Sequence, residues 1–278
     1  MKLVVTGAGG ALGRAFLAQV PNGSDVIALA HTDLDVGNHQ AVMRTVVPLG
    51  PDAVLNFAAF TDVDACEGER GRAYRDNALA AQSLALASRQ VGAVLLHVST
   101  DYIFDGTKVD PYDELDAPGP LSVYGRSKLA GETFVRRLMP EHFVVRTGYV
   151  FGRASGYASR ALSQLASGET VGGIADRVGS PTFVVDLAAR ILPLLLTGRF
   201  GTYHLAGPEA TTWFDVLSRA RAIGGFAGRV EPQAAGDLGL SAPRPRSSAL
   251  GSVFTGPIGL EPLPPLDDAL ARFVRASA

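Results

Sequence analysis

The chain has 278 residues and a formal net charge of −2, with acidic and basic residues mixed along it, which argues against nucleic acid or a membrane surface as an obligate partner. Its one cysteine, Cys66, excludes an internal disulfide and fits a reducing cytoplasm, where we expect the protein to act. We expect no signal peptide, because glycines interrupt the short apolar run after Lys2, and no membrane span, because the most apolar stretch, residues 187–196, is short and contains Arg190. This length suits one large α/β domain or two lobes.

The N-terminal residues predict a strand, a glycine-rich loop and a helix that runs to Val20. The loop has the spacing Gly7-x-x-Gly10-x-x-Gly13. Glycines in this setting permit a tight turn and a close approach of the backbone to a pyrophosphate, which the helix N-terminus faces. The sequence therefore predicts a dinucleotide site, with Gly7, Gly10, Ala11, Leu12 and Gly13 against the cofactor.

A second strand is predicted over residues 25–30, and its end bears on the choice of cofactor. The usual NAD-binding pattern places a carboxylate there to bind the ribose 2′-hydroxyl, whereas this chain has Ala30, His31 and Thr32. Without that carboxylate nothing repels a 2′-phosphate, so we predict NADPH as cofactor, with NADH possible. His31 and Arg14 could contact the phosphate, and the alternative for His31 is an ordinary surface histidine.

The third strand is predicted over residues 52–57, followed by small residues against which a cofactor can lie. Phe57 is predicted to point into the core. Residues 70–91 predict one long, alanine-rich helix. Asn77 on that helix is predicted to brace the active-site loop by hydrogen bonding, with a capping or solvent-facing Asn as the alternative.

Residues 93–139 carry the pattern that points to chemistry. An apolar run over residues 93–98 predicts a buried strand that ends near Thr100, and residues 127–139 have helical periodicity. Tyr124 and Lys128 lie four apart, so a helix would place them on one face. The Lys cation would lower the pKa of the phenol and make Tyr124 a general acid for a carbonyl that receives hydride, while Thr100 hydrogen-bonds the carbonyl oxygen. The alternative is a Tyr and a Lys that happen to share a surface helix.

Residues 142–146 predict the next strand, and the alternation of strands and helices is typical of a doubly wound parallel sheet. In such a sheet function gathers at the carboxyl ends of the strands. Those ends are predicted at Thr6, Ala58, Thr100 and Thr147.

The rest of the chain has a looser pattern. Helices are predicted over residues 157–166, 183–196, 212–223 and 265–275, the third of them capped by Thr211 or Thr212, and a strand over residues 201–205. Residues 224–265 are dense in Gly and Pro and are predicted to be loops. We predict no metal site, because the five histidines are scattered.

Together these motifs resemble the extended short-chain dehydrogenase/reductases, and within them the dTDP-4-dehydrorhamnose reductases. The resemblance is carried by the glycine loop, residues 34–36, residues 56–64, Asn77, residues 99–106, Tyr124 to Glu132, Arg146-Thr147, residues 179–182 and residues 203–207. It implies a Rossmann-type α/β fold with a smaller C-terminal substrate-binding lobe. Residues 1–149 and 183–206 would form the dinucleotide-binding domain, and residues 150–182 and 207–278 the substrate lobe.

The resemblance also implies an activity and its residues. The activity is the NADPH-dependent reduction of the C4 keto group of a nucleotide-linked 6-deoxy sugar, dTDP-4-dehydrorhamnose, in dTDP-rhamnose biosynthesis. The partner would thus be a nucleotide-sugar substrate, and the resemblance is compatible with a homodimer. The catalytic residues would be Thr100, Tyr124 and Lys128. The cofactor would be bound by the glycine loop, Tyr124 and Lys128, together with His31, Asp35, Val36, Ala58, Ala59 and Thr61. The substrate would be bound by Val63, Thr100, Asp101, Tyr102 and Tyr149.

Four departures from the family pattern fall in the predicted substrate lobe or at its border. Tyr149 replaces a Trp that packs on the sugar, Arg177 replaces Gln, Ser247 replaces Asn and Gly251 replaces Asp. They leave open a sibling nucleotide-sugar reductase, an epimerase with bound NAD, or a non-catalytic NADP-binding regulatory subunit like the methionine adenosyltransferase β subunit. The intact Thr100, Tyr124 and Lys128 favour an enzyme.

Overall fold

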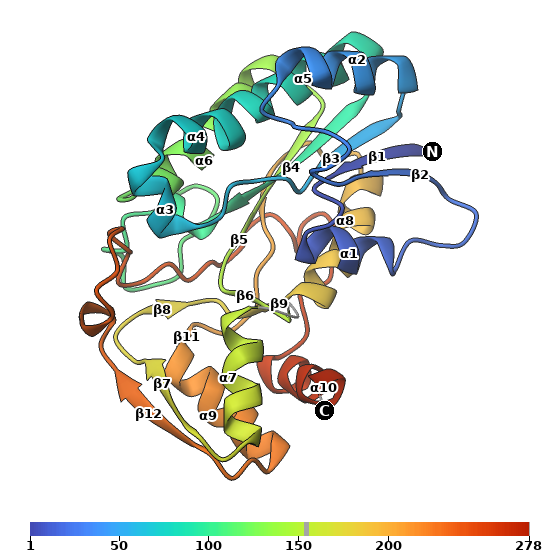
Figure 1. Ribbon diagram of the computed structural model, residues 1–278. Helices are drawn as coiled ribbons and strands as arrows, with labels where there is room; N and C mark the ends of the chain where they lie inside the picture. Colours follow the sequence, from blue (N-terminus) through green and yellow to red (C-terminus); the bar gives the residue numbers. More distant parts are fainter. Residues whose placement is uncertain (153–155, 278) are drawn as a thin grey trace.

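The computed structural model describes residues 1–152 and 156–277, and within them six parallel strands form one sheet with helices on both faces (Figure 1). The strands are β1 (Lys2–Thr6), β2 (Asp25–Leu29), β3 (Ala53–Asn56), β4 (Val94–Thr100), β5 (His142–Thr147) and β10 (Gly201–His204). Their order is β10-β5-β4-β3-β1-β2, which confirms the predicted doubly wound sheet. The order reverses between β1 and β3, where ligands bind in folds of this type.

Alternate residues of each strand pack into two separate cores, because successive side chains of a strand point to opposite faces of the sheet. Leu3 and Val5 of β1 join the core beneath α1 (Ala11–Leu17) and α8 (Val184–Leu196). Val4 joins the core beneath α2 (His39–Leu49), α5 (Ala80–Val91) and α6 (Val123–Leu138). Burial on both faces explains why the strands are nearly continuous apolar runs.

Helix α2 was not predicted from the sequence, although its ends carry clear signals. The side chain of Asn38 accepts a hydrogen bond from the backbone N–H of Ala41, and Gly50 ends the helix in the left-handed region. Pro48 in its last turn obscures the pattern. The buried residues Val42 and Val46 hold α2 against the sheet.

The predicted helix over residues 70–91 is present but interrupted. It consists of α4 (Arg70–Tyr74), a π-helical turn η1 (Arg75–Leu79) and α5, after the short helix α3 (Val63–Gly68). Such turns are rare and occur often at functional sites. Helix α6 begins at Val123, earlier than the periodicity indicated, because the hydroxyl of Ser122 accepts a hydrogen bond from Gly125 N at 3.1 Å and caps it. Tyr124 and Lys128 therefore lie on one helix, as predicted.

A separate apolar core lies beyond the sheet, in the lower part of Figure 1. It is built by α7 (Tyr157–Ala166), α9 (Trp213–Gly224) and α10 (Leu266–Ser277), with Phe151 and Phe183. Three short strand pairs frame it: β6 (Val150–Phe151) with β9 (Thr182–Phe183), β7 (Thr170–Ile174) with β12 (Arg229–Gln233), and β8 (Val178–Gly179) with β11 (Thr211–Thr212). The division into lobes at the residues given above stays a prediction.

The prediction that residues 224–265 are loops was wrong in part. They contain β12, which pairs in parallel with β7, and a short 3₁₀ helix, η3 (Ala235–Leu238). Strand β12 depends on a partner more than fifty residues earlier in the chain, so no local pattern reveals it. Among the described helices, none combines the length and the apolar character that crossing a membrane requires.

Candidate active site

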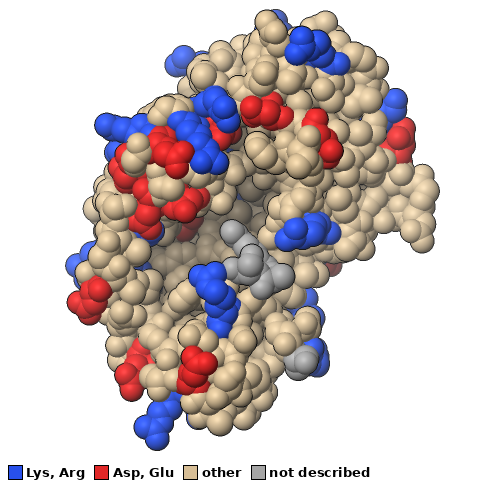
Figure 2. All heavy atoms as spheres, in the orientation of Figure 1, with Lys and Arg blue, Asp and Glu red and all other residues tan. Residues whose placement is uncertain are grey.

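Two neighbouring cavities lie at the carboxyl ends of β1, β3, β4 and β5, and the molecule is visibly hollowed on this face (Figure 2). The first cavity has a volume of about 410 Å³ and the second about 470 Å³. Gly10, Phe57 and Ala59 line both. Every residue that the family resemblance assigns to catalysis, cofactor binding or substrate binding lines at least one of them. The first is lined by Gly10, Ala11, Leu12, Gly13, Ala59, Thr61, Val63, Thr100, Asp101, Tyr102, Tyr124, Lys128 and Tyr149, and the second by Gly7, His31, Asp35, Val36 and Ala58 among others.

The glycine loop packs backbone against backbone, which leaves no room for side chains. Gly7 has a φ of 70°, and a Cβ added to it would lie 2.5 Å from Ala58 N. A Cβ added to Gly13 would lie 2.5 Å from the carbonyl oxygen of Gly7. This tight packing turns the N-terminus of α1 toward the cavities, as a dinucleotide loop requires.

The end of β2 presents backbone and a histidine to the second cavity. Ala30, His31 and Thr32 line it, and the nearby carboxylate of Asp33 turns back to accept a hydrogen bond from Ala30 N at 2.8 Å. Arg14 does not line either cavity; its guanidinium donates to the carbonyl oxygen of Gly9. The suggested contact of Arg14 with a 2′-phosphate stays a prediction.

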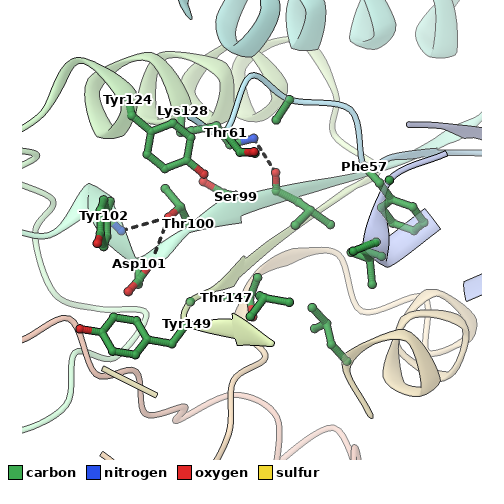
Figure 3. A pocket seen from close by; sticks show the side chains of 18 of the residues that line it. Phe57, Thr61, Ser99, Thr100, Asp101, Tyr102, Tyr124, Lys128, Thr147 and Tyr149 are labelled. Atoms are coloured by element: carbon green, nitrogen blue, oxygen red, sulfur yellow. Dashed lines mark hydrogen bonds between the residues drawn. The ribbon is translucent and has the colours of Figure 1, made fainter. Parts of the chain in front are cut away.

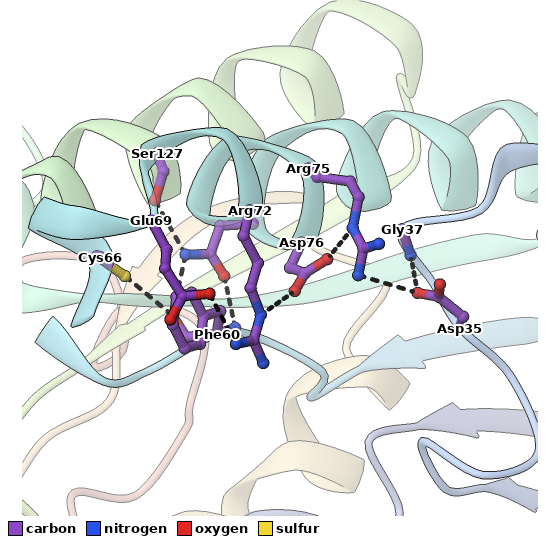
Figure 4. A network of polar contacts seen from close by, with 10 residues as sticks. Asp35, Gly37, Phe60, Cys66, Glu69, Arg72, Arg75, Asp76 and Ser127 are labelled. Carbon is purple, nitrogen blue, oxygen red and sulfur yellow. Dashed lines mark hydrogen bonds and ion pairs between the residues drawn. The ribbon is translucent and has the colours of Figure 1, made fainter.

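A chain of alternating charges borders the second cavity (Figure 4). Arg72 contacts Glu69 and Asp76 at 3.0 and 3.4 Å, and Arg75 contacts Asp76 and Asp35 at 2.7 and 3.7 Å. Arg72 also lies over the ring of Phe60, with its guanidinium carbon 4.1 Å from the ring centroid. Exposed pairs like these add little stability, but they join α4 and η1 to the loop that carries Asp35.

Asn77 confirms its predicted role as a brace. It lies in η1 and is buried. Its Oδ1 accepts a hydrogen bond from Phe60 N at 2.8 Å, and its Nδ2 donates to the Phe60 carbonyl at 3.0 Å and to Ser127 Oγ at 2.9 Å (Figure 4). One side chain thereby ties the loop after β3 to α6.

Thr100, Tyr124 and Lys128 meet at the first cavity (Figure 3). The Lys128 side chain is buried, and its Nζ donates to the carbonyl oxygen of Val98 at 2.7 Å. Burial lowers the pKa of Lys128 to about 8, against the opposing effect of the Glu132 carboxylate. Tyr124 packs edge-on against Tyr102, with ring centroids 6.2 Å apart. Thr100 ends β4, so the strand itself aims its hydroxyl at the cavity.

Asp101 is a buried carboxyl at the same place. Its Oδ1 accepts a hydrogen bond from Thr100 Oγ1 at 3.0 Å, and its Oδ2 accepts one from Ser248 Oγ at 2.5 Å. Burial raises its pKa to about 6, although both hydrogen bonds lower it. Gly148 makes room for the carboxyl, because a Cβ there would lie 2.3 Å from Asp101 Cγ. Sequence reasoning missed Ser248, which arrives from the C-terminal part of the chain.

The remaining wall of the first cavity is apolar and aromatic. Tyr149 has a φ of 46°, and among the described residues no other non-glycine residue has a positive φ. Its ring stacks on that of Trp213, with centroids 5.4 Å apart and planes 7° apart. Trp213 also lines the cavity and was not predicted as a site residue. The sequence signal that could have identified Trp213 as a site residue was a tryptophan at the start of a predicted helix.

Of the four departures from the family pattern, only Tyr149 lines the first cavity; Ser247 instead pairs with Val178, and Gly251 donates its N–H to the carbonyl of Tyr112. Phe57 packs edge-on against Phe16 and against the core beneath α1 and α8, as predicted, and it also lines both cavities. The described residues contain no cluster of three or more His, Cys, Asp or Glu that could bind a metal.

Comparison with known proteins places the chain in a family. Residues 1–278 match the family described as RmlD substrate binding domain. The chain belongs to the RmlD family. The dTDP-4-dehydrorhamnose reductase of Mycobacterium tuberculosis is 40% identical over 289 aligned positions, which cover 100% of this chain and 93% of that protein. The dTDP-4-keto-6-deoxy-D-glucose reductase of Streptomyces niveus is 35% identical, with 94% of this chain and 92% of that protein covered.

Solved structures agree with the family assignment. The dTDP-4-dehydrorhamnose reductase from Bacillus anthracis in complex with NADP superposes with a TM-score of 0.95 at 33% identity, covering 99% of this chain and 100% of that one. The chain is therefore an oxidoreductase of the RmlD family with a Rossmann-like fold, similar over its full length to nucleotide-sugar reductases.

Proposed function

We propose that this RmlD-family protein reduces the C4 keto group of dTDP-4-dehydrorhamnose with NADPH and forms dTDP-L-rhamnose. The observation that carries the proposal is the meeting of Thr100, Tyr124 and Lys128 in one cavity that the glycine loop also lines. A phenol, a hydroxyl and the glycine loop thus line one cavity, as a proton donor, a ligand of the carbonyl oxygen and a cofactor cradle would have to.

The residues around the two cavities fit a dinucleotide. The backbone packing of Gly7 and Gly13 leaves a side-chain-free cradle at the N-terminus of α1, suited to a pyrophosphate. Asp35 and Val36 line the second cavity where the adenine is expected. His31 and Thr32 line it at the ribose end, and the neighbouring Asp33 carboxylate is turned back to Ala30 N. We therefore propose NADPH as the preferred cofactor, and the NADP complex of the B. anthracis relative supports this choice.

The reaction requires a hydride at C4 and a proton on the carbonyl oxygen; NADPH supplies the hydride when bound. Tyr124 donates its phenolic proton to the oxygen, so that one C–H bond and one O–H bond form and the phenolate later regains a proton from solvent. Thr100 turns its hydroxyl from Asp101 to the same oxygen and orients it. An ammonium has three donors, so Lys128 can bind a ribose hydroxyl and stabilise the phenolate while it keeps its bond to Val98.

The test is a turnover screen with NADPH against dTDP-4-dehydrorhamnose, dTDP-4-keto-6-deoxyglucose and UDP-linked 4-keto sugars. Turnover is measured as the loss of NADPH absorbance at the nicotinamide band. We expect the highest kcat/KM with dTDP-4-dehydrorhamnose. A higher value with dTDP-4-keto-6-deoxyglucose would make the protein a sibling reductase, as the S. niveus relative is by name. Bound NADPH without turnover of any sugar would favour the regulatory-subunit alternative.

A further inference from the structure

Trp213 is the one tryptophan of the chain, and it stands on the wall of the first cavity. It is the first residue of α9, and the cap of that helix fixes its backbone. Thr212 Oγ1 accepts a hydrogen bond from Asp215 N at 3.1 Å and donates to the Asp215 carboxylate at 2.7 Å. A half-buried indole on a capped helix start is a rigid feature of the cavity rather than a mobile surface residue.

Two tyrosines hold the indole in its orientation. Tyr149 stacks in parallel on it, and Tyr157 packs edge-on with its ring centroid 5.4 Å away and its plane at 81°. The hydroxyl of Tyr157 donates to the Gly172 carbonyl at 2.7 Å, which anchors that ring in turn. Tyr149 is confined from another direction, because a Cβ added to Gly179 would lie 2.5 Å from its ring atoms. Much of the ring surface of Tyr149 is therefore used in contacts within the protein.

We propose that Trp213 provides the aromatic surface on which the sugar ring of the nucleotide sugar packs, and that Tyr149 is a positioning residue that supports the indole. This inference rests on the proposed function and assigns a residue of that same site. A 6-deoxy sugar carries a methyl group in place of a hydroxymethyl group, so one edge of it is apolar and gains from burial against a flat ring. Its hydroxyls and keto group are then left for Thr100, Asp101 and Tyr102 on the polar wall.

Because Trp213 is the sole tryptophan, the emission of the unmodified protein reports on this one position. The protein is loaded with NADP⁺, excited at the red edge of the tryptophan band, and titrated with dTDP-L-rhamnose or with dTDP, which lacks the sugar. We expect dTDP-L-rhamnose to change the emission intensity with the midpoint that calorimetry gives for its binding, and dTDP to change it much less. An equal change with dTDP would place the nucleotide, not the sugar, on Trp213 and overturn the inference.

Two variants test the same contact through catalysis. Trp213→Leu keeps an apolar side chain but removes the ring, and we expect kcat/KM for the 4-keto sugar to fall about 10- to 100-fold, mainly through KM, as for a lost pocket contact. Trp213→Phe should restore most of that loss, and the Kd for NADPH should be unchanged in both. Phe254→Leu is the matched control, because it removes a partly exposed ring that lines neither cavity, and kcat/KM should stay unchanged.

The outcomes separate this inference from the proposed function. If calorimetry shows no binding of any dTDP sugar, the proposed function fails and the inference with it. If dTDP-L-rhamnose binds but the emission stays constant, or if a folded Trp213→Leu keeps the KM of the unmodified protein, the inference alone fails. The fluorescence titration needs no variant, so it decides the matter even if Trp213→Leu does not fold.

Discussion

The two sides of the first cavity are built in different ways. The cofactor side is made of backbone: the glycine loop packs on the loop after β3, and strand ends place Thr100 and the start of α1. The substrate side is made of side chains from distant positions, with Tyr149 stacked on Trp213 and Asp101 bonded to Ser248. A backbone wall tolerates few substitutions, whereas a side-chain wall can change its chemistry while the sheet stays intact.

That difference agrees with the one departure from the family pattern that lines the cavity, Tyr149. Thr100, Tyr124 and Lys128 are all present, and Tyr149, at the position where the resemblance implies a Trp, stands on the side-chain wall. Asp101 lies at the junction of the two sides, because one of its oxygens is bonded to Thr100 and the other to Ser248. Substitutions on each side should therefore affect different measured quantities.

The largest effect is expected at Tyr124, on the side that the sheet and α6 hold in place. Tyr124→Phe should lower kcat by about 10²- to 10⁴-fold, the usual contribution of a positioned general acid, with the Kd for NADPH unchanged. Stopped-flow turnover together with a fluorescence titration of NADPH measures both quantities. Turnover near that of the unmodified protein would mean that the proton comes from another group.

Asp101 should give the folded protein a pH dependence of stability. Its pKa is about 6 in the folded state against 3.8 as the ordinary value, so the unfolded chain releases this proton first. The free energy of unfolding therefore falls as pH rises from about 4 to 6, by roughly 3 kcal/mol at most, and stays constant above. Asp101→Asn should remove this part of the slope in urea titrations at several pH values. Asp25→Asn, at an exposed position, should keep it, and an Asp101→Asn slope equal to that of the unmodified protein would contradict the assignment.

The backbone wall can be tested by adding a side chain to it. Gly10→Val should weaken NADPH and NADH binding about 10- to 100-fold, corresponding to the 1–3 kcal/mol typical of overpacking, because a Cβ there already lies 3.1 Å from the Gly7 carbonyl oxygen. Gly9→Ala is the control, since its Cβ would make only an ordinary contact of 3.6 Å with Ala30. Calorimetry of both variants gives the result, and strong cofactor binding by Gly10→Val would show that the pyrophosphate lies elsewhere.

The smallest effect is expected from a conservative change on the side-chain wall. Tyr149→Phe and Tyr149→Trp should change kcat/KM for dTDP-4-dehydrorhamnose by less than about 3-fold, because the ring makes the contacts with Trp213 and Gly179. Tyr149→Ala removes that ring and should cost about 1–3 kcal/mol in transition-state binding. A large loss in Tyr149→Phe alone would instead assign the hydroxyl to a group of the sugar, and a different sugar would then be the better substrate.

The sequence by itself determined the sheet and the reaction side of the site. Buried parallel strands are apolar runs, the glycine loop has a fixed spacing, and Tyr124 and Lys128 are one helical turn apart, so each signal lies within a short segment. The brace by Asn77 also followed, because the helix that carries it runs past the loop after β3. These features depend on local backbone geometry, which local sequence specifies.

Only the tertiary structure decided the substrate side. Ser248 reaches Asp101 across 147 positions of the chain, Trp213 meets Tyr149 from the start of α9, and β12 forms because β7 lies beside it. No periodicity or spacing predicts such contacts, because each partner alone is an ordinary serine, tryptophan or polar strand. Their energies come from burial and stacking that exist only after the two parts of the chain have packed together.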